Sequence, residues 1–282
     1  MMGPLQEIII VLLEITMNKS EIIERLKPIR CFLLDMDGTF YLGNLLLEGS
    51  LAFLDKVGQT GRQTMFLTNN SSKSARDYLQ KLERMGVVAP YLNVLTSGQA
   101  TAQYALKTFP GKRAYVLGTQ ALRTEVSNAG IMIDDNDPDF VLIGYDTTLD
   151  YPKMTRVCDL VRSGLPYIAT HPDYNCPTEM GFTPDIGAII AFIEASAGRK
   201  PDVIIGKPNR GIVEEAIRIT GLSAGELAMV GDRLYTDIAM AARHGMLGVL
   251  VLTGEAAKAD IAGSPHQPDL VFDRLADMIP FL

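Results

Sequence analysis

Short apolar runs alternate with stretches of helical pattern along the chain from about residue 30 onward. The runs at 31–34 and 64–67 end abruptly in polar residues, which is typical of strands buried on both faces of a parallel sheet. The segment 74–85, followed by Gly86, is typical of a helix between two such strands. The same pattern predicts further strands at 93–96, 114–117, 140–143, 167–169, 203–205, 227–230 and, as the last clear one, 249–252. It predicts further helices at 99–107, 121–129, 152–162, 189–195, 210–219 and 234–244. These repeated units predict an α/β protein with a Rossmann-like, doubly wound parallel sheet.

Composition and charge narrow the classes of protein. The chain has 282 residues, 47% of them hydrophobic, which suffices for one large domain or two smaller ones. The net charge of −7 comes from charges scattered along the chain, which argues against a nucleic-acid partner and against a membrane surface. Three cysteines without a CxxC spacing argue against a disulfide framework and against a zinc site. We therefore expect a cytoplasmic protein.

The N-terminal segment carries a short apolar run at 8–13 between Glu7 and Glu14. The run is too short for a membrane span and lacks the basic front end of a secretory signal. We expect residues 1–16 to be a dispensable extension, from an upstream start codon, and residues 1–28 to comprise this extension and a lead-in helix.

Two aspartates, Asp35 and Asp37, directly follow the first apolar run. If strand geometry persists, they point the same way, and two neighbouring carboxylates can divide the roles of nucleophile and acid/base. A polar turn before Gly38 is the simpler interpretation of Asp-x-Asp alone. The longer pattern of four apolar residues, Asp-x-Asp-Gly-Thr and an aromatic residue is far narrower, and it favours the functional interpretation.

Polar groups also follow other predicted strands, at the sheet edge where open α/β proteins bind ligands. Thr68 could hold phosphate oxygens with the N–H groups that follow it, or it could cap the next helix. Lys207, before Pro208, could neutralise a phosphoryl group, or it could be a solvated surface lysine. Asp232 and Asp237 could supply oxygen ligands to Mg²⁺, or they could cap and polarise the helix that they begin.

Taken together, these residues resemble the haloacid dehalogenase superfamily in its phosphatase form. Its four motifs occur in order: Asp35 to Thr39, then Thr68, then Lys207, then Gly231-Asp232 with Asp237. The resemblance covers nearly the whole chain from about residue 29. The phrases Thr68-Asn69-Asn70-Ser71, Gly198-Arg199-Lys200-Pro201 and Gly206-Lys207-Pro208-Asn209 look like the NagD/4-nitrophenylphosphatase branch.

The resemblance implies a mechanism and a set of site residues. Asp35 would attack phosphorus to form an aspartyl-phosphate, and Asp37 would protonate the leaving oxygen and then activate water. Mg²⁺ would be held by the Asp35 carboxylate, the Asp37 carbonyl and Asp232, with support from Asp237. Thr68, Asn69 and Lys207 would bind the transferring phosphoryl group. The implied activity is hydrolysis of small-molecule phosphate monoesters, such as a sugar phosphate, a nucleotide or a related metabolite.

Motif spacing predicts the domain organisation. Only 32 residues separate Asp35 from Thr68, whereas 138 separate Thr68 from Lys207. The longer interval predicts an α/β cap domain at 98–184, inserted into a core domain formed by 29–97 and 185–282. In the cap, His171 and Asp173 end an apolar run. They either cap a turn around Pro172 or contact the leaving group of the substrate.

Other functions remain as alternatives. A dehalogenase on the same fold has no use for Asp37 as an acid, and related phosphoryl mutases carry a cap after the first motif, where the 32-residue interval leaves no room. A receiver-like aspartyl-phosphate switch uses similar residues, but receivers are shorter and have no cap. An inactive scaffold is disfavoured because every motif position is occupied. The physiological substrate is left open, as is the oligomeric state, with a homodimer as one alternative.

Overall fold

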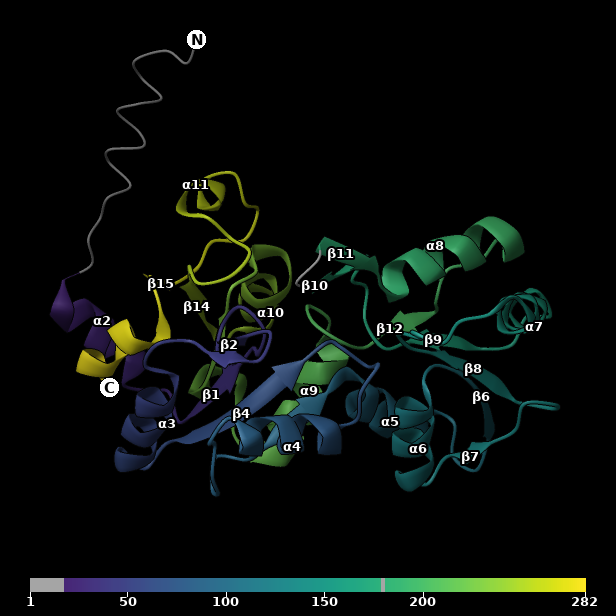
Figure 1. Ribbon diagram of the computed structural model, residues 1–282, viewed down its shortest axis with the longest axis horizontal. Coiled ribbons are helices and arrows are strands. Elements are labelled where there is room, and N and C mark those ends of the chain that lie inside the picture. The colour runs from purple at the N-terminus through teal and green to yellow at the C-terminus, as the bar shows by residue number, and fades with distance from the viewer. Residues whose placement is uncertain (1–17, 179–180) are drawn as a thin grey trace, which may run out of the picture.

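The computed structural model, shown in Figure 1, describes residues 18–178 and 181–282. A core sheet and a cap sheet lie side by side along the long axis of the molecule, and each has helices on both faces. Every neighbouring pair of strands within these two sheets is parallel. The predicted α/β class and the doubly wound parallel sheet are therefore confirmed. Within the described residues, no helix is long and apolar enough to cross a membrane.

The core sheet has the strand order β15–β14–β13–β1–β4–β5. Its strands are β1 (Cys31–Leu34), β4 (Gln63–Thr68), β5 (Val94–Thr96), β13 (Leu227–Gly231), β14 (Leu247–Val251) and β15 (Leu270–Phe272). One face is covered by α2 (Lys19–Leu26), α3 (Ser50–Gln59), α4 (Ala75–Arg84) and the 3₁₀ segment η3 (Leu275–Phe281). The other face is covered by α9 (Arg210–Thr220) and α10 (Ala239–His244). A short helix, α11 (Lys258–Ile261), follows β14, and a 3₁₀ turn, η1 (Ala224–Glu226), precedes β13.

The central strand β1 explains why its sequence is apolar at every position. Phe32 and Leu34 pack into the cluster on one face of the sheet, whereas Cys31 and Leu33 pack into the cluster on the other. All four side chains are buried, because side chains alternate between faces and helices cover both of them. The strand therefore delivers the residue that follows it, Asp35, to the carboxyl edge of the sheet.

The cap sheet has the strand order β12–β9–β8–β6–β7. Its strands are β6 (Arg113–Leu117), β7 (Met132–Ile133), β8 (Phe140–Ile143), β9 (Tyr167–Ala169) and β12 (Val203–Ile204). Helices α5 (Ser97–Thr108) and α6 (Gln120–Asn128) pack on one face. Helices α7 (Tyr151–Arg162) and α8 (Ile186–Ala197) pack on the other.

We propose that the second domain boundary lies further along the chain than residue 184. A boundary after residue 184 would leave α8 and β12 with the core, but β12 pairs with β9 of the cap sheet. Ile186 and Ile193 of α8 pack against the same sheet in one cluster with Tyr167. The apolar run at 203–205 has the composition of a strand of the core sheet. Only its pairing with β9 assigns it to the cap sheet. We propose a boundary after Ile204, with α5 shared between core and cap because its alanines pack into clusters of both.

Several short elements were not predicted. They include helix α3, strand β15 and two hairpins, β2 (Tyr41–Leu42) with β3 (Leu45–Leu46) and β10 (Asn175–Thr178) with β11 (Gly181–Pro184). The β10–β11 hairpin contains proline and glycine, which weaken a strand pattern, so no strand was predicted there. The predicted helix at 234–244 begins with a π-helical turn, η2 (Leu234–Ile238). The lead-in helix corresponds to α2, whereas residues 1–16 lie outside the described residues.

Candidate active site

A cleft of about 200 Å³ opens at the carboxyl ends of the core strands, where the cap faces the core. Asp35, Asp37, Thr68, Asn69 and Lys207 all line it. These residues come from three separate segments of the chain, and the parallel order of β1 and β4 places the first two segments side by side. The structure thus brings together the groups that the sequence singled out at strand ends.

Asp35 continues the β1 ladder, because its N–H donates to the carbonyl of Val230 at 2.9 Å. The backbone then turns at Gly38, whose φ of +87° is a conformation that favours glycine. A Cβ at this position would lie 2.5 Å from Oδ2 of Asp232, so a side chain here would collide with that carboxylate. Partial desolvation in the cleft raises the pKa of Asp37, opposed by Lys81 and reinforced by Asp35. A raised pKa suits a group that donates a proton.

Lys207 lies at the centre of the site and is only 3% exposed. Its Nζ donates to Oδ1 of Asp35 at 2.5 Å, to Oδ1 of Asp237 at 2.8 Å and to the carbonyl of Leu67 at 3.3 Å. Burial alone would lower the pKa of Lys207, but the carboxylates of Asp237 and Asp35 outweigh burial and raise it. The ammonium therefore stays charged beside Asp35 and is not the solvated surface lysine of the alternative interpretation.

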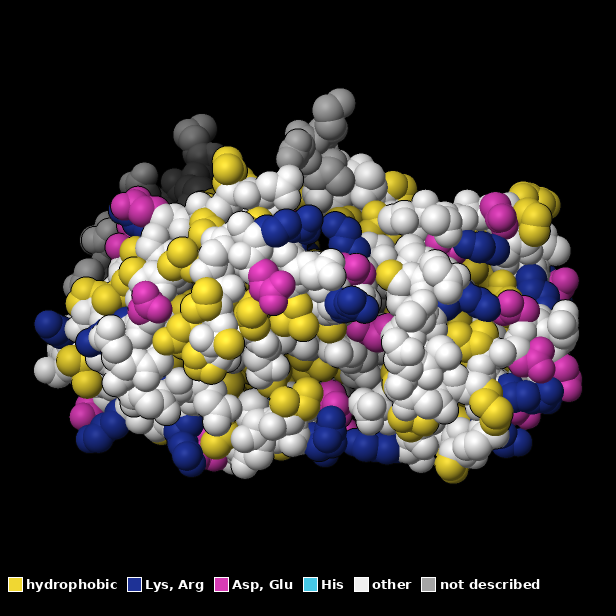
Figure 2. Space-filling view, turned by 60° about the horizontal axis from the view of Figure 1, so that its bottom comes forward, with side chains coloured by type: hydrophobic (Ala, Val, Ile, Leu, Met, Phe, Trp, Pro, Cys, Tyr) yellow, Lys and Arg dark blue, Asp and Glu magenta, His cyan; other side chains and the backbone are white. Residues whose placement is uncertain are grey.

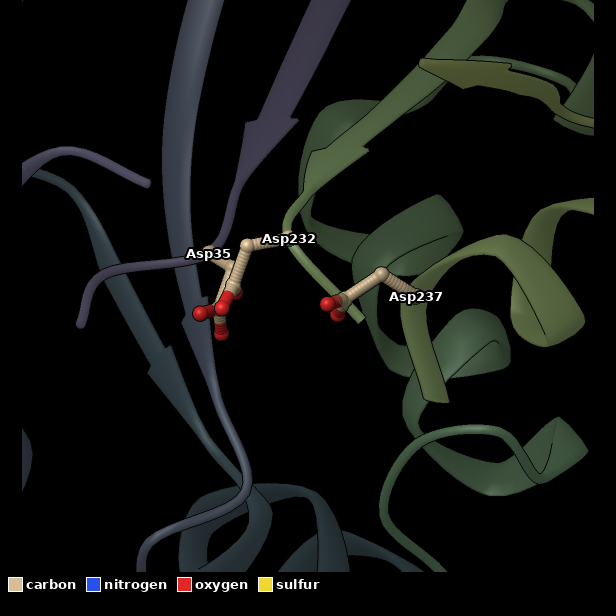
Figure 3. Close-up of side chains that lie close together, drawn as sticks. All are labelled: Asp35, Asp232 and Asp237. Atoms are coloured by element: carbon tan, nitrogen blue, oxygen red, sulfur yellow. The ribbon is translucent and has the colours of Figure 1, made fainter. Parts of the chain in front are cut away.

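The carboxylates of Asp35, Asp232 and Asp237 converge on one space, as Figure 3 shows. One oxygen from each lies within 4.8 Å of the others. Burial raises the pKa of Asp232, and the neighbouring Asp35 and Asp237 add to this effect. Burial also raises the pKa of Asp237 despite its contact with Lys207. Crowded, buried carboxylate oxygens are a donor set that fits a hard cation such as Mg²⁺, which would offset their mutual repulsion.

The side chain of Asn69 connects the site to the cap. Its Oδ1 accepts from the N–H of Lys207 at 2.7 Å, and its Nδ2 donates to the carbonyl of Lys207 at 2.9 Å. Nδ2 also lies 3.1 Å from Oδ2 of Asp173. Because these contacts engage the side-chain amide, we expect any direct contact of Asn69 with phosphate to use its backbone N–H.

The segment 69–72, here called the cap–core loop, is bonded to the cap at several points. The hydroxyl of Ser71 lies 2.9 Å from the hydroxyl of Thr170 and accepts from the N–H of Tyr145 at 2.9 Å. The hydroxyl of Thr119 donates to the carbonyl of Ser72 at 2.8 Å. Ser71 and Thr170 are fully buried, so the loop ties the core to the cap at a point shielded from bulk solvent.

The two cap residues predicted from the sequence have different environments. Asp173 lines the cleft, and its role toward a substrate remains a prediction. His171 is fully buried and does not line the cleft, which disfavours the alternative in which it contacts the leaving group. Its ring nitrogens lie 3.6 Å from Asp173 and 3.6 Å from Asp185, so it packs behind the cleft wall between two carboxylates. Thr170, directly before His171, donates its N–H to the carbonyl of Ile143 in β8 at 3.0 Å, and its hydroxyl lies 2.9 Å from that of Ser71 in the cap–core loop.

Other cleft residues were not identified from the sequence. Arg233 is mostly buried, and its Nε lies 3.0 Å from Oε2 of Glu255. Its position directly after Asp232 was the one available signal. Lys73, Lys81 and Tyr41 also line the cleft. The sequence offered no signal for them, because they lie on helix α4, on the segment before it and on the β2–β3 hairpin, none of which carries a strand-end pattern.

Comparisons with known proteins agree with this architecture. A family model described as haloacid dehalogenase-like hydrolase matches residues 32–132, and a HAD-hydrolase-like model matches residues 204–278. These intervals contain the aspartates, Thr68 and Lys207 of the cleft. The fold and the site define a hydrolase of this class. The chain belongs to the haloacid dehalogenase-like hydrolase family.

Individual relatives are phosphatases. An acid sugar phosphatase from Staphylococcus aureus is 36% identical over 255 residues, which cover 90% of this chain and 98% of that protein. The solved 4-nitrophenylphosphatase from Thermotoga maritima is 46% identical with a TM-score of 0.88, covering 91% of this chain and 98% of that one. NagD from Escherichia coli is 34% identical with a TM-score of 0.81, covering 88% and 98%. The chain is thus a phosphatase of this family, in the branch that the sequence indicated.

A further solved relative was determined with a metal ion. The glycerol phosphate phosphatase from Mycobacterium tuberculosis, in complex with magnesium, is 29% identical with a TM-score of 0.81. The alignment covers 89% of this chain and 76% of that one.

Proposed function

We propose that this chain is a Mg²⁺-dependent phosphatase that hydrolyses small-molecule phosphate monoesters through an aspartyl-phosphate on Asp35. The observation that carries the proposal is the position of Lys207, whose ammonium contacts both Asp35 and Asp237 at the bottom of the cleft. A fixed positive charge beside a carboxylate nucleophile lets a dianionic phosphoryl group approach it.

The first step transfers the phosphoryl group to the enzyme. A carboxylate oxygen of Asp35 attacks phosphorus, and the bond from phosphorus to the alcohol oxygen breaks. Asp37 gives its proton to that oxygen, which its raised pKa favours at the start of the step. Lys207 and the groups around Thr68 hold the transferring phosphoryl oxygens.

The second step regenerates the enzyme. Asp37, now ionised, takes a proton from water, and the water oxygen forms a new bond to phosphorus. The bond between phosphorus and Asp35 breaks, which restores the carboxylate and releases inorganic phosphate. Both steps use the same pair of residues two positions apart, and Asp37 ends with the proton that it had at the beginning.

The carboxylate cluster would hold Mg²⁺ through Asp35 and Asp232, with Asp237 supporting the arrangement from its contact with Lys207. When bound, the ion would supply charge neutralisation between the nucleophile and the phosphoryl group. Asp232 is itself positioned by the N–H of Glu255 at 2.8 Å and by the hydroxyl of Thr39 at 3.3 Å.

The test is hydrolysis of 4-nitrophenyl phosphate with the metal present and after EDTA. Asp35→Asn is expected to abolish turnover and phosphoenzyme, because an amide is a poor nucleophile. Asp37→Asn is expected to slow both steps and to accumulate phosphoenzyme from this activated ester, detected by intact mass after acid quench. Full activity of Asp35→Asn or of the EDTA-treated enzyme would contradict the proposal. A stable wild-type phosphoenzyme without turnover would favour the receiver-like switch instead.

A further inference from the structure

Two lysines line the cleft beside Asp37. Lys81 lies on α4, and its Nζ sits 3.7 Å from the centre of the Tyr41 ring, a cation–π contact that fixes the ammonium. Lys73 lines the same cleft from the segment before α4. Burial lowers the pKa of Lys81 and the charge of Lys73 adds to this effect, whereas Asp37 opposes it. Figure 2 shows Lys and Arg side chains that border a recess near the middle of the face in view.

These two lysines differ from the other cations of the cleft. Lys207 contacts two carboxylates, and Arg233 pairs with Glu255. Within residues 18–178 and 181–282, by contrast, neither Lys73 nor Lys81 forms an ion pair with a carboxylate. Two like charges on one cleft wall, neither of them in an ion pair, favour an anionic ligand group.

The positions of Lys73 and Lys81 indicate which part of a substrate they would contact. Lys81 acts electrostatically on Asp37, the residue proposed to protonate the leaving oxygen. The phosphoryl group would lie deeper, at Asp35 and Lys207. An anionic group near Lys81 would therefore belong to the leaving alcohol and not to the phosphoryl group.

The volume of the cleft restricts the size of that alcohol. At about 200 Å³ the cleft is smaller than the roughly 300–1,000 Å³ usual for drug-sized ligands. Much of this space would be taken by the phosphoryl group. A carboxylate on a short carbon chain fits such a space better than a nucleoside or a second phosphate does.

We propose that Lys81 and Lys73 bind a carboxylate on the leaving group, so that the preferred substrates are phosphate esters of compact hydroxy acids. This inference rests on the proposed phosphatase function and specifies its substrate class. Hydrolysis would proceed by the two steps above, and the products would be the free hydroxy acid and inorganic phosphate.

The experiment compares 3-phosphoglycerate with glycerol 3-phosphate, two esters that differ in a carboxylate against a hydroxymethyl group. The wild-type enzyme is expected to have the higher kcat/KM for 3-phosphoglycerate. Lys81→Gln should lower the ratio of the two kcat/KM values about tenfold, mainly through the KM for 3-phosphoglycerate, whereas any change in kcat that acts through Asp37 should be shared by both esters. Lys73→Gln should have a smaller effect in the same direction, because Lys73 is the more exposed of the two. Lys81→Arg should restore most of the preference.

The matched control is Arg84→Gln, which removes a positive charge from the same helix. Arg84 is exposed, lies one turn after Lys81 and does not line the cleft. Arg84→Gln should leave the ratio of the two kcat/KM values unchanged. Equal loss for both esters in Lys81→Gln, or an altered ratio in Arg84→Gln, would show a general effect of charge and overturn the inference.

The outcome also separates this inference from the proposed function. A wild-type enzyme that hydrolyses 4-nitrophenyl phosphate but shows no preference for 3-phosphoglycerate would overturn the inference and leave the phosphatase proposal intact. A second comparison measures the ratio of kcat/KM for fructose 1,6-bisphosphate to that for fructose 6-phosphate. If this ratio were larger than the ratio for 3-phosphoglycerate to glycerol 3-phosphate, the assignment to a carboxylate would be overturned. A wild-type enzyme inactive toward every ester would overturn both.

Discussion

The buried contact between the cap–core loop and the cap provides a measurable test of how the two domains are held together. In Ser71→Ala the hydroxyl is lost, and with it the contacts to the Thr170 hydroxyl and to the N–H of Tyr145, each at 2.9 Å. Neither group can turn to water, because Ser71 and Thr170 are fully buried. The variant therefore leaves a backbone donor and a hydroxyl without these partners.

The size of the effect follows from the cost of unsatisfied buried groups. Each such group costs about 1–3 kcal/mol, so the loss of partners for two groups in Ser71→Ala should lower the free energy of unfolding by about 2–6 kcal/mol. Thr170→Val keeps the shape of the side chain and leaves Ser71 bonded to Tyr145, so its cost should be about 1 kcal/mol. Because the two changes remove one shared contact, the double variant should be less destabilised than the sum by about 1 kcal/mol.

Urea unfolding followed by circular dichroism measures these values for the wild type, both single variants and the double variant. Ser163→Ala is the matched control, because its hydroxyl bonds only locally, to the carbonyl of Leu160 at 2.7 Å, and its loss should change stability by less than about 0.5 kcal/mol. A cost for Ser71→Ala no larger than that of Ser163→Ala would refute the reasoning. Strict additivity in the double variant would show that the two hydroxyls do not interact.

Three further outcomes are expected from the site. Lys207→Met should lower kcat by roughly 100- to 1,000-fold, because it removes the charge beside Asp35; rapid-mix kinetics with 4-nitrophenyl phosphate measures the loss. Mg²⁺ should raise the thermal unfolding midpoint of the wild type and much less that of Asp232→Asn, and an equal rise in both would remove Asp232 from the metal site. Asp173→Asn should reorder kcat/KM among phosphate esters by about 1–3 kcal/mol while inhibition by inorganic phosphate barely changes; a uniform loss across esters would indicate a structural role.

Much of the core could be predicted from the sequence because burial leaves a strong local signal. The run Cys31–Leu34 is apolar throughout since helices cover both faces of β1, and the polar residue that follows must then reach the sheet edge. Asp35, Thr68 and Lys207 were found through this relation, and the structure brings all three to one cleft. For each of these three residues, the residue type and its position after a predicted strand indicated the same site.

Properties that depend on pairing between distant segments could not be predicted. The run at 203–205 looks like a core strand, and only its register with β9 assigns it to the cap. His171 ends an apolar run as Asp35 does, yet the chain turns it inward between Asp173 and Asp185. Lys81 lies on a helix whose orientation decides whether its ammonium faces solvent or the cleft. A linear pattern carries no record of that orientation.

The short distance from β12 to Lys207 has a consequence for exchanging caps between related enzymes. β12 ends at Ile204, and the chain reaches Lys207 after only two residues, one of which is Gly206. A Cβ on Gly206 would lie 2.6 Å from Oδ1 of Asn69 and 2.7 Å from the carbonyl of Thr170. The segment that returns from the cap to the core is therefore too closely packed for any side chain at residue 206. A transplanted cap joined at Ile205 would therefore need its own β9 and β12 in the same register to return the lysine to Asp35. A junction that instead keeps β12, Gly206 and Lys207 with the recipient, and splices the donor only up to α8, would preserve the lysine. It would replace the β10–β11 hairpin, whose first strand lines the cleft.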